Sequence, residues 1–530
     1  MTLNHFVSRA KSMHQASRIV AATADGGRER VGFPMWAERV QRVGPMLDQL
    51  GISPGARVGT LAWNTVQHLE LTFGIPCSGR ILHAVNIQLP PEQAAYTIDH
   101  AKDEVLFVDP SLLTRAWPML RERTSVRHIV VMAGDRAHIP SEAADRVLYY
   151  EELMAAAPKT GTFSPQDEHR AAVLCYTSGS TGHPKGVLYS HRSLFLSTLA
   201  LMTRDLCGIG ADDTVMPIAP LYHAGARGYP HAAIATGAHL VLAGPHPTPE
   251  TIVDLLEQEH VTVAAAVPTI WAACAPLLPG RRLDSLRRLG SGGSLTSPEV
   301  QQTYQRHAGV PLLTGWGMTE TSAVGTLPPD PHNTSHTSAV GKLPAGSEGR
   351  IVDPDTEQPW DGQAVGELQL RAPWAAAAYL DNDTTPSTPD GWLRTGDLAT
   401  FSPDGSITLA GRLNDLIKSG GEWISPLALE SAITSCPAVR QAAVIAVDHP
   451  HWGQRPAAYI VPASHAPDPV SDVRDHLNST IPAWQIPDQF ILVEALPTGG
   501  TGKPDKKALV QDYQHRQATV PPHRVDVSRR

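Results

Sequence analysis

The sequence predicts an α/β fold built as more than one domain, from its length and from its hydrophobic pattern. With 530 residues, the chain is longer than one hydrophobic core supports, so two or more domains are expected. Between residues 33 and 108, short apolar runs alternate with helical patterns. Strands separated by helices indicate a parallel sheet with right-handed crossovers.

The elements of this first region follow from the spacing of apolar residues and turn residues. Helices are expected at residues 43–50, 66–75 and 91–101, and strands at 57–61, 80–85 and 105–108. The alternation continues with a strand at 129–132 and a helix at 190–202. This region is interpreted as scaffold, because no motif in its first 108 residues identifies chemistry.

The composition excludes several classes of protein. Apolar residues make up 42% and charged residues 18% of the chain, so disorder and coiled coil do not describe it as a whole. The net charge of −9 argues against broad binding of nucleic acid or anionic membranes, because both attract basic surfaces. Five cysteines without a CxxC pair indicate reduced thiols in a cytoplasmic protein.

Neither export nor membrane insertion is expected. The first 20 residues are polar and basic throughout and contain no apolar run of signal-peptide length. Residues 261–280 carry no charge over the length of a membrane span. Because Pro268 and Pro276 interrupt them, a buried strand through Val267 followed by a helix from Thr269 is predicted instead, and no transmembrane segment.

Residues 176–186, which read YTSGSTGHPKG, have the composition of a phosphate-binding loop between two strands. Glycines let backbone N–H groups turn toward an anion, while hydroxyls and an ammonium supply donors and charge. The residues expected to bind are Thr177, Ser178, Gly179, Ser180, Thr181, Gly182 and Lys185. The loop is not a Walker motif, because Pro184 stands where that motif has a glycine. Taken alone, most runs of this kind are ordinary Ser/Gly surface loops.

Further motifs follow this loop. They are GSGGS at 290–294, TGWGMTET at 314–321, WLRTGDL at 392–398, GRLND at 411–415, KSGGEWIS at 418–425 and LPTGGTGKPDKK at 496–507. In this order they resemble the motifs of the adenylate-forming superfamily, which holds acyl-CoA synthetases, luciferases and peptide-synthetase adenylation domains. The resemblance runs from about Trp36 to about Leu509 and is greatest to the fatty-acyl-CoA ligase branch.

The resemblance implies a large N-terminal adenylation domain at residues 1–411, with layered sheets flanked by helices and a β-barrel-like part. It implies a small, mobile C-terminal α+β domain at 412–513, and the polar residues 514–530 are expected to form a disordered tail. The pivot between the domains is usually Lys or Asp, but here it is Asn414. Asn tolerates unusual backbone angles and lacks the charge.

The resemblance also assigns the nucleotide site. Glu320 would bind Mg²⁺, which prefers carboxylate and phosphate oxygens, and Trp316 would present its face to the purine. Asp397 would accept hydrogen bonds from both ribose hydroxyls, with Arg412 beside it. The other expected ATP/AMP-binding residues outside the phosphate loop are Gly292, Gly293, Ser294, Gly315, Gly317, Met318 and Thr319. The expected catalytic residues are Lys503, which would bridge the carboxylate and the α-phosphate, together with Glu320, Thr181 and His223.

Residues 220–227, PLYHAGAR, would border an acyl pocket formed by Tyr222, His223, Arg227 and Gly292. The branch usually has an apolar aromatic residue at or beside position 227. A guanidinium next to an alkyl chain is costly unless it is paired. Either Arg227 turns out to the surface, or the acid carries polar groups that it binds. The CoA path would be lined by Lys418, Gly420, Gly421 and Trp423.

The implied function is ATP-dependent activation of a hydrophobic carboxylic acid to an acyl-adenylate with release of pyrophosphate, followed by transfer to CoA. Such an acid–thiol ligase uses ATP, Mg²⁺ and CoA and serves fatty acid metabolism. An alternative is an enzyme of specialised metabolism acting on a bulky oxygenated acid, with acyl transfer slow or made by a partner enzyme. A third is a regulatory nucleotide-binding protein, which the presence of Lys503, Glu320 and Asp397 disfavours. The identity of the acid stays open, as does a homodimer.

Overall fold

The structure is a computed structural model of the chain. It describes residues 1–123, 125–132, 139–159, 162–163, 166–177, 183–328, 339–354, 356–360, 364–380, 386–420, 422–463, 467–497 and 504–519. The chain divides into two compact units. The first contains Met1–Arg350, Gln369–Thr395 and Phe401–Thr408, and the second contains Ile351–Leu368, Gly396–Thr400 and Leu409–Arg530. The expected boundary at residue 411 stays a prediction of the sequence.

Two seven-stranded sheets form the frame of the first unit. One has the order β7 (Val147–Tyr149), β6 (His128–Val131), β5 (Val105–Val108), β3 (Arg57–Leu61), β4 (Ile81–Ala84), β8 (Ala171–Tyr176) and β9 (Gly186–Ser190). The other has the order β14 (Leu312–Thr314), β13 (Arg288–Ser291), β12 (Val263–Ala266), β10 (Thr214–Pro217), β11 (His239–Leu242), β1 (Arg18–Ala22) and β2 (Arg28–Gly32). Neighbouring strands are parallel except the last pair of each sheet, β8–β9 and β1–β2, which is antiparallel.

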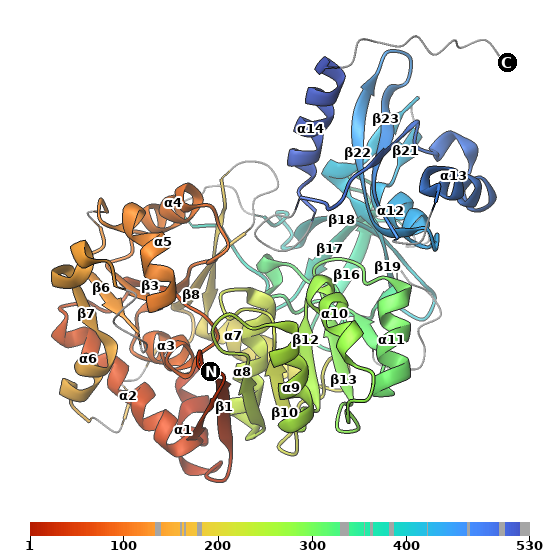
Figure 1. The fold of residues 1–530 in the computed structure, drawn as a ribbon. Coiled ribbons are helices and arrows are strands. Elements are labelled where there is room, and N and C mark those ends of the chain that lie inside the picture. Colours follow the sequence, from red (N-terminus) through yellow and green to blue (C-terminus); the bar gives the residue numbers. More distant parts are fainter. Residues whose placement is uncertain are drawn as a thin grey trace. The chain divides into compact units, whose positions relative to one another are not determined.

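Helices cover both faces of these sheets, as Figure 1 shows. The helices are α1 (Asn4–Ser12), α2 (Phe33–Gln49), α3 (Val66–Cys77), α4 (Pro91–Ala101), α5 (Pro110–Leu120), α6 (Tyr150–Ala156), α7 (His191–Met202), α8 (Ala224–Thr236), α9 (Pro249–Gln258), α10 (Pro268–Cys274) and α11 (Pro298–Ala308). The largest buried cluster joins side chains of both sheets with those of α1, α2, α3, α7 and α8. A second cluster joins α9, α10 and α11 to the β12–β13 sheet, and a third joins α4 and α5 to the β3–β5 sheet. The expected α/β fold with layered sheets and flanking helices is confirmed.

Local signals place these helices close to where the sequence predicts them. Side chains of Thr65, Asp109 and Ser190 accept hydrogen bonds from the first turns of α3, α5 and α7, which satisfies N–H groups that would otherwise lack partners. The helix expected at 43–50 is longer, because α2 buries apolar residues at helical spacing from Phe33 onward. No helix in the described part of the chain combines the length and apolar character that a membrane crossing requires.

The β-rich stretch after residue 338 forms a five-stranded sheet. Its order is β15 (Ala339–Gly341), β19 (Ile407–Arg412), β18 (Leu393–Phe401), β17 (Gly366–Arg371) and β16 (Glu348–Val352). A further sheet has the order β21 (Glu422–Ile424), β20 (Ile417–Ser419), β23 (Gly453–Pro462) and β22 (Val439–His449), and β24 (Gln489–Leu492) also pairs with β23. The helices α12 (Pro426–Thr434), α13 (Pro469–Thr480) and α14 (Lys506–Thr519) accompany it.

The end of the chain differs from the expectation of a disordered tail at residues 514–530. Residues 514–519 belong to α14, and residues 520–530 lie outside the described part. Helix α14 is held by Leu509, which is buried with Tyr459 of β23, and by an i,i+4 ion pair of 2.6 Å between Arg516 and Asp512. The packing of Leu509 against β23, together with this ion pair within the helix, outweighs the polar composition of the segment.

Candidate functional site

The base of the predicted phosphate loop is a β-hairpin. Strands β8 and β9 pair in antiparallel register, with Tyr176 opposite Gly186. The Thr177 N–H donates to the Lys185 carbonyl at 2.9 Å, and the Lys185 N–H donates to Oγ1 of Thr177 at 3.2 Å. The hairpin therefore holds Thr177 and Lys185 side by side. The other predicted residues of this loop lie outside the described residues; they are Ser178, Gly179, Ser180, Thr181 and Gly182.

Glu320 lies on a short 3₁₀ turn, Thr319–Thr321, that follows the TGWGM segment. Its residue is 8% exposed, and its Oε1 accepts a hydrogen bond of 2.7 Å from the hydroxyl of Tyr379. The turn is fixed from the other side by Tyr189 of β9, whose hydroxyl donates to the Thr319 carbonyl at 2.6 Å. The carboxylate is thus oriented within the first unit, close to the hairpin.

Tyr379 links Glu320 to the phosphate loop, and sequence reasoning missed it. Its backbone forms a bridge with Val187 of β9, and the next residue, Leu380, donates to the Gly186 carbonyl at 2.7 Å. The Lys185 ammonium lies 5.0 Å from the centre of the Tyr379 ring, within the range of a cation–π contact. Burial, and then the neighbouring Glu320 carboxylate, raise the pKa of Tyr379, so its hydroxyl stays a donor at neutral pH.

The motifs GSGGS (290–294) and TGWGMTET (314–321) lie side by side because they lie at the ends of the neighbouring parallel strands β13 and β14. Ala266 of β12 pairs with Ser291 of β13, which pairs with Thr314 of β14, so the carboxyl ends of the three strands are level. The Gly315 N–H donates to the Ser291 carbonyl at 2.8 Å, and the Gly292 N–H donates to the Ala266 carbonyl at 3.2 Å. Ligands of parallel α/β sheets bind beyond the carboxyl ends of the strands. Gly292, Gly293 and Ser294 are at most half-buried there.

The TGWGMTET segment folds back on residues 323–326. Trp316 and Thr326 exchange backbone hydrogen bonds of 3.2 and 2.8 Å. A Cβ on Gly317 would lie 2.6 Å from the Ala323 carbonyl oxygen, and one on Gly325 would lie 2.3 Å from that of Trp316. Only glycine fits such close backbone approaches. They place Trp316, Met318 and Thr319 on the same loop as Glu320.

Three of the predicted acyl-pocket residues, Tyr222, His223 and Arg227, lie at the start of α8, whereas Gly292 follows β13. His223 occupies the N-cap position, and its ring centre is 4.6 Å from that of the buried Tyr222. Burial raises the pKa of Tyr222, so this phenol is neutral. The two rings are in contact and tilted by 53° to one another.

Arg227 does not turn out to the surface, so that alternative is wrong. The residue is 2% exposed, because it follows His223 by one helical turn and points at β8 and β9. Its Nη2 lies 2.6 Å from Sγ of Cys175, and the carbonyl oxygens of Leu221 and Tyr222 lie 3.5 Å from the guanidinium. Its Cζ is 5.7 Å from the ring centre of Tyr189. Within the described residues, no carboxylate forms an ion pair with Arg227.

In the second unit the structure brings Asp397 and Arg412 together. Nε of Arg412 lies 2.8 Å from Oδ1 of Asp397, whose side chain is 9% exposed while that of Arg412 is 45% exposed. The pair joins strands β18 and β19. An ionised carboxylate can accept several hydrogen bonds, which suits the recognition of vicinal hydroxyl groups.

The predicted hinge and CoA-path residues also lie in the second unit. Asn414 occupies a 3₁₀ turn, Leu413–Asp415. Lys418 and Trp423 pair across β20 and β21, with the ammonium 5.1 Å from the ring centre. Gly420 has a φ of +60° in the turn between these strands, and the Trp452 ring covers it. Gly421 and Lys503 lie outside the described residues.

The described residues contain no group of three or more His, Cys, Asp or Glu side chains that could by itself hold a metal ion. Glu320 offers one oriented carboxylate. This fits Mg²⁺, which is commonly bound by one or two carboxylates together with phosphate oxygens and water.

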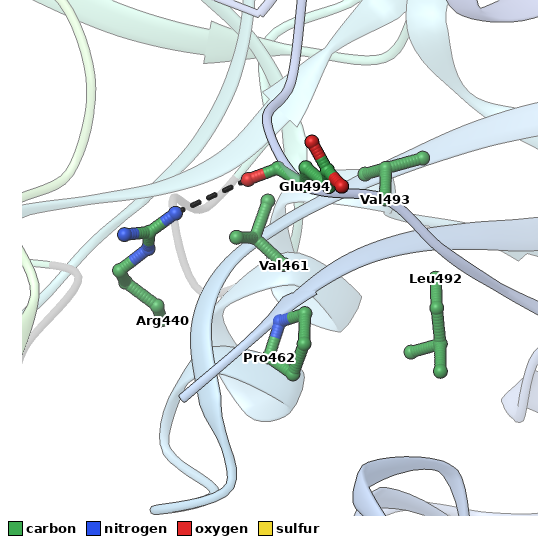
Figure 2. Close-up of a pocket in the computed structure, with 6 residues that line it drawn as sticks. All are labelled: Arg440, Val461, Pro462, Leu492, Val493 and Glu494. Carbon is green, nitrogen blue, oxygen red and sulfur yellow. Dashed lines mark hydrogen bonds between the residues drawn. The ribbon is translucent and has the colours of Figure 1, made fainter. Parts of the chain in front are cut away.

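A shallow pocket in the second unit is unrelated to these motifs. Figure 2 shows its lining, which consists of Arg440, Val461, Pro462, Leu492, Val493 and Glu494. Nη2 of Arg440 donates to the Glu494 carbonyl at 3.2 Å. None of the predicted site residues lines this pocket.

Comparison with known proteins gives a consistent result. The family described as AMP-binding enzyme matches residues 9–380, and the AMP-binding enzyme C-terminal domain matches residues 428–503. The chain is 37% identical to a 3-methylmercaptopropionyl-CoA ligase of Ruegeria lacuscaerulensis, over 97% of both chains. It is 36% identical to a long-chain-fatty-acid–CoA ligase of Thermus thermophilus, over 97% of this chain and 96% of that one. The crystal structure of the anthranilate CoA ligase AuaEII has the same fold, with a TM-score of 0.86, 23% identity and 98% coverage of both chains.

Proposed function

The chain belongs to the AMP-binding enzyme family and is an acyl-CoA synthetase of the adenylate-forming superfamily, and on this premise we propose a role for each residue of its site. The protein is an acid–thiol ligase. It uses ATP to activate a carboxylic acid as the acyl-adenylate and then transfers the acyl group to CoA. Four relatives that are 34–37% identical over nearly the whole chain are CoA ligases. They do not favour the alternative in which a partner enzyme makes the transfer.

In the first step, a carboxylate oxygen of the acid attacks the α-phosphorus of ATP and pyrophosphate leaves with its bonding electron pair. The carboxylate is already a nucleophile, so no general base is required. The site must align the two reactants and offset charge on the phosphates. Thr177, Lys185 and the loop residues between them would hold the β- and γ-phosphates. Lys503 would contact the incoming carboxylate and the α-phosphate.

Glu320 would hold Mg²⁺ together with phosphate oxygens, and the ion would supply charge neutralisation when bound. Tyr379 keeps the Glu320 carboxylate in one orientation through its hydrogen bond of 2.7 Å. The same ring lies against Lys185, so one tyrosine sets the spacing between the ammonium and the carboxylate. This arrangement is the observation that carries the proposal, because both groups address the same triphosphate.

The remaining nucleotide contacts would come from three places. The segment Gly292, Gly293 and Ser294 and the loop with Trp316 would border the adenine. Asp397 would accept hydrogen bonds from both ribose hydroxyls, with Arg412 holding its carboxylate. A bidentate acceptor of this kind distinguishes a ribose from a 2′-deoxyribose.

In the second step, the thiolate of CoA would attack the acyl carbon, and AMP would leave with the electrons of the acyl–oxygen bond. Lys418, Gly420, Gly421 and Trp423 would line the approach of the pantetheine arm. The small domain would turn at Asn414. Asn at the pivot lacks the charge of Lys or Asp, so this step is the slower one in the proposal.

We propose an apolar acid of short to long chain length as the substrate. Relatives that match the whole chain are named for 3-methylmercaptopropionate and for medium- and long-chain fatty acids. Arg227 is compatible with such an acid, because its guanidinium is held by Cys175 and by backbone carbonyls. It therefore does not need a polar group on the substrate. Five free, buried cysteines support a reducing compartment such as the cytoplasm.

The test is acid-dependent exchange of labelled pyrophosphate into ATP, with 3-methylmercaptopropionate, octanoate, palmitate and benzoate offered separately. We expect exchange with at least one apolar acid, and formation of the matching acyl-CoA once CoA is added. Glu320→Gln is the matched control, since it keeps the shape of the side chain and removes the charge. Absence of exchange with every acid would favour a regulatory nucleotide-binding protein instead.

A further inference from the structure

The helix α4 lies against both ends of the predicted phosphate loop. Tyr96 and His100 are four residues apart on α4 and therefore share one face of the helix. Their rings stack, with centres 5.4 Å apart and planes at 26°. The other face of α4 carries the buried residues Ala94, Ala95, Thr97, Ile98 and Ala101, which fix the helix on the sheet. The two aromatic side chains are thus presented from a rigid support.

His100 binds Tyr176, the residue that precedes Thr177. Nδ1 of His100 lies 2.8 Å from the hydroxyl of Tyr176, and the two rings meet edge to face at 5.8 Å. The Tyr176 ring also packs against Gly186 on the opposite strand. A Cβ added to Gly186 would lie only 3.3 Å from Cζ of Tyr176. His83 is 5.0 Å from the same ring and is itself hydrogen-bonded to the buried Asp103 at 2.7 Å.

Tyr96 contacts His183, where the described part of the chain resumes after Thr177. The ring of Tyr96 stacks on His183, with centres 4.4 Å apart and planes at 23°. His183 is exposed and precedes Pro184 and Lys185. Aromatic contacts of this kind add about 0.5–1.5 kcal/mol beyond the area they bury. No part of the phosphate-binding motif requires an aromatic ring at position 183, so this contact is a feature of the fold of this chain.

We propose that Tyr96 and His100 are positioning residues for ATP binding, which rests on the proposed function of the loop. By holding Tyr176 and His183, they fix the chain beside Thr177 and Lys185, the two described residues of the motif that would contact the phosphates. Holding binding groups in place before the ligand arrives lowers the conformational entropy that binding must offset. Fixing Thr177 and Lys185 in this way strengthens ATP binding without a contact between the nucleotide and Tyr96 or His100.

The experiment compares Tyr96→Ala with Tyr96→Phe in the full-length protein. Binding of MgATP is measured by calorimetry without any acid, and the KM for ATP and kcat are measured by pyrophosphate exchange with octanoate. Tyr96→Ala is expected to raise the Kd and KM for ATP roughly tenfold. We expect kcat within about twofold of the wild type and an unchanged KM for octanoate, because in this proposal Tyr96 acts on ATP binding through His183 and not through contact with a reactant. Tyr96→Phe keeps the ring and should bind ATP as the wild type does.

Two further variants separate positioning from general stability. The double variant Tyr96→Ala with His183→Ala should be no weaker than Tyr96→Ala alone, because both changes break the same contact. Gln93→Ala changes an exposed residue of the same helix and should leave both constants unchanged. Melting temperatures of all variants show whether each one folds.

Three results would overturn the inference. The first is an unchanged Kd for ATP in Tyr96→Ala. The second is an equal loss in Tyr96→Phe, since the ring would then be irrelevant. The third is additive losses in the double variant. If the wild type binds MgATP but exchanges no pyrophosphate, the proposed function fails while the calorimetric comparison still decides the positioning role. If the wild type binds no nucleotide, both fail.

Discussion

The hydroxyl of Tyr379 donates a hydrogen bond of 2.7 Å to Oε1 of Glu320. The two residues are 59 positions apart in the chain, and Tyr379 reaches Glu320 because its backbone forms a bridge with Val187 of β9. The same ring faces the ammonium of Lys185. Tyr379 lies outside the motifs recognised in the sequence, and it connects the phosphate loop at Lys185 with the TGWGMTET motif at Glu320.

Tyr379→Phe should weaken catalysis while keeping the fold. The ring would still contact Lys185, but the carboxylate of Glu320 would lose a hydrogen bond worth about 1.5–3 kcal/mol. We expect a loss of roughly 10- to 100-fold in kcat/KM for pyrophosphate exchange, and a shift of the Mg²⁺ dependence to higher concentration. Measuring the rate of pyrophosphate exchange as a function of Mg²⁺ concentration gives both the loss of kcat/KM and the shift of the Mg²⁺ dependence. An unchanged Mg²⁺ dependence would show that Glu320 does not rely on Tyr379.

Lys503→Ala should slow formation of the acyl-adenylate by at least ~100-fold, by analogy with the loss of one donor to the transition state. Lys506 provides the matched control, because it is a nearby lysine that forms a 2.9 Å ion pair with Glu430 within the second unit. Such a partly exposed pair contributes little, so Lys506→Ala should exchange pyrophosphate nearly as the wild type does. Near-normal exchange in Lys503→Ala would refute its assignment.

Asp397→Asn should affect recognition of the ribose more than recognition of the phosphates. The amide keeps the shape of the side chain but loses the charge that pairs with Arg412 at 2.8 Å, and it offers one acceptor oxygen in place of two. We expect the KM for ATP to rise roughly tenfold or more. The wild type should prefer ATP over 2′-deoxy-ATP, and the variant should lose most of that preference. Equal preference in both proteins would remove Asp397 from the ribose site.

Buried histidines make the first unit sensitive to acid. Burial lowers the pKa of His68 and of His191 to about 4, and lowers that of His231 to about 3, with Arg227 also lowering the pKa of His68 and His231. These groups bind protons in the unfolded state near their ordinary pKa of 6.5 and stay neutral in the folded state. Their contribution to stability is therefore complete above about pH 6.5 and decreases as the pH falls toward 4.

Urea unfolding between about pH 7 and pH 5 measures this loss. His231→Leu is the informative variant, because Nε2 of His231 is buried and has no hydrogen-bond partner among the described residues, and the centre of its ring lies 5.0 Å from that of Phe73. Removing His231 should reduce the pH slope of the unfolding free energy by an amount that approaches one proton, or ~1.4 kcal/mol per pH unit, near pH 5. An unchanged slope would mean that His231 is not neutral in the folded protein.

Much of the site is readable in the sequence, because each motif is local. Glycines and hydroxyls must be consecutive to form an anion-binding turn, and their order along the chain identifies the family. Regular elements such as β3 at Arg57–Leu61 and α4 at Pro91–Ala101 are readable for the same reason, since the spacing of apolar residues records which face is buried.

The tertiary structure alone decided which side chains meet across long stretches of chain. Strand register puts Tyr379 beside β9, and helix phase turns Arg227 toward Cys175 instead of the surface. The stack of Tyr96 on His183 likewise depends on where α4 lies on its sheet. The chemistry of a motif depends on residues that are neighbours in the sequence. The side chains that orient those residues are brought to them by packing between helices and strands, and no local sequence pattern encodes that packing.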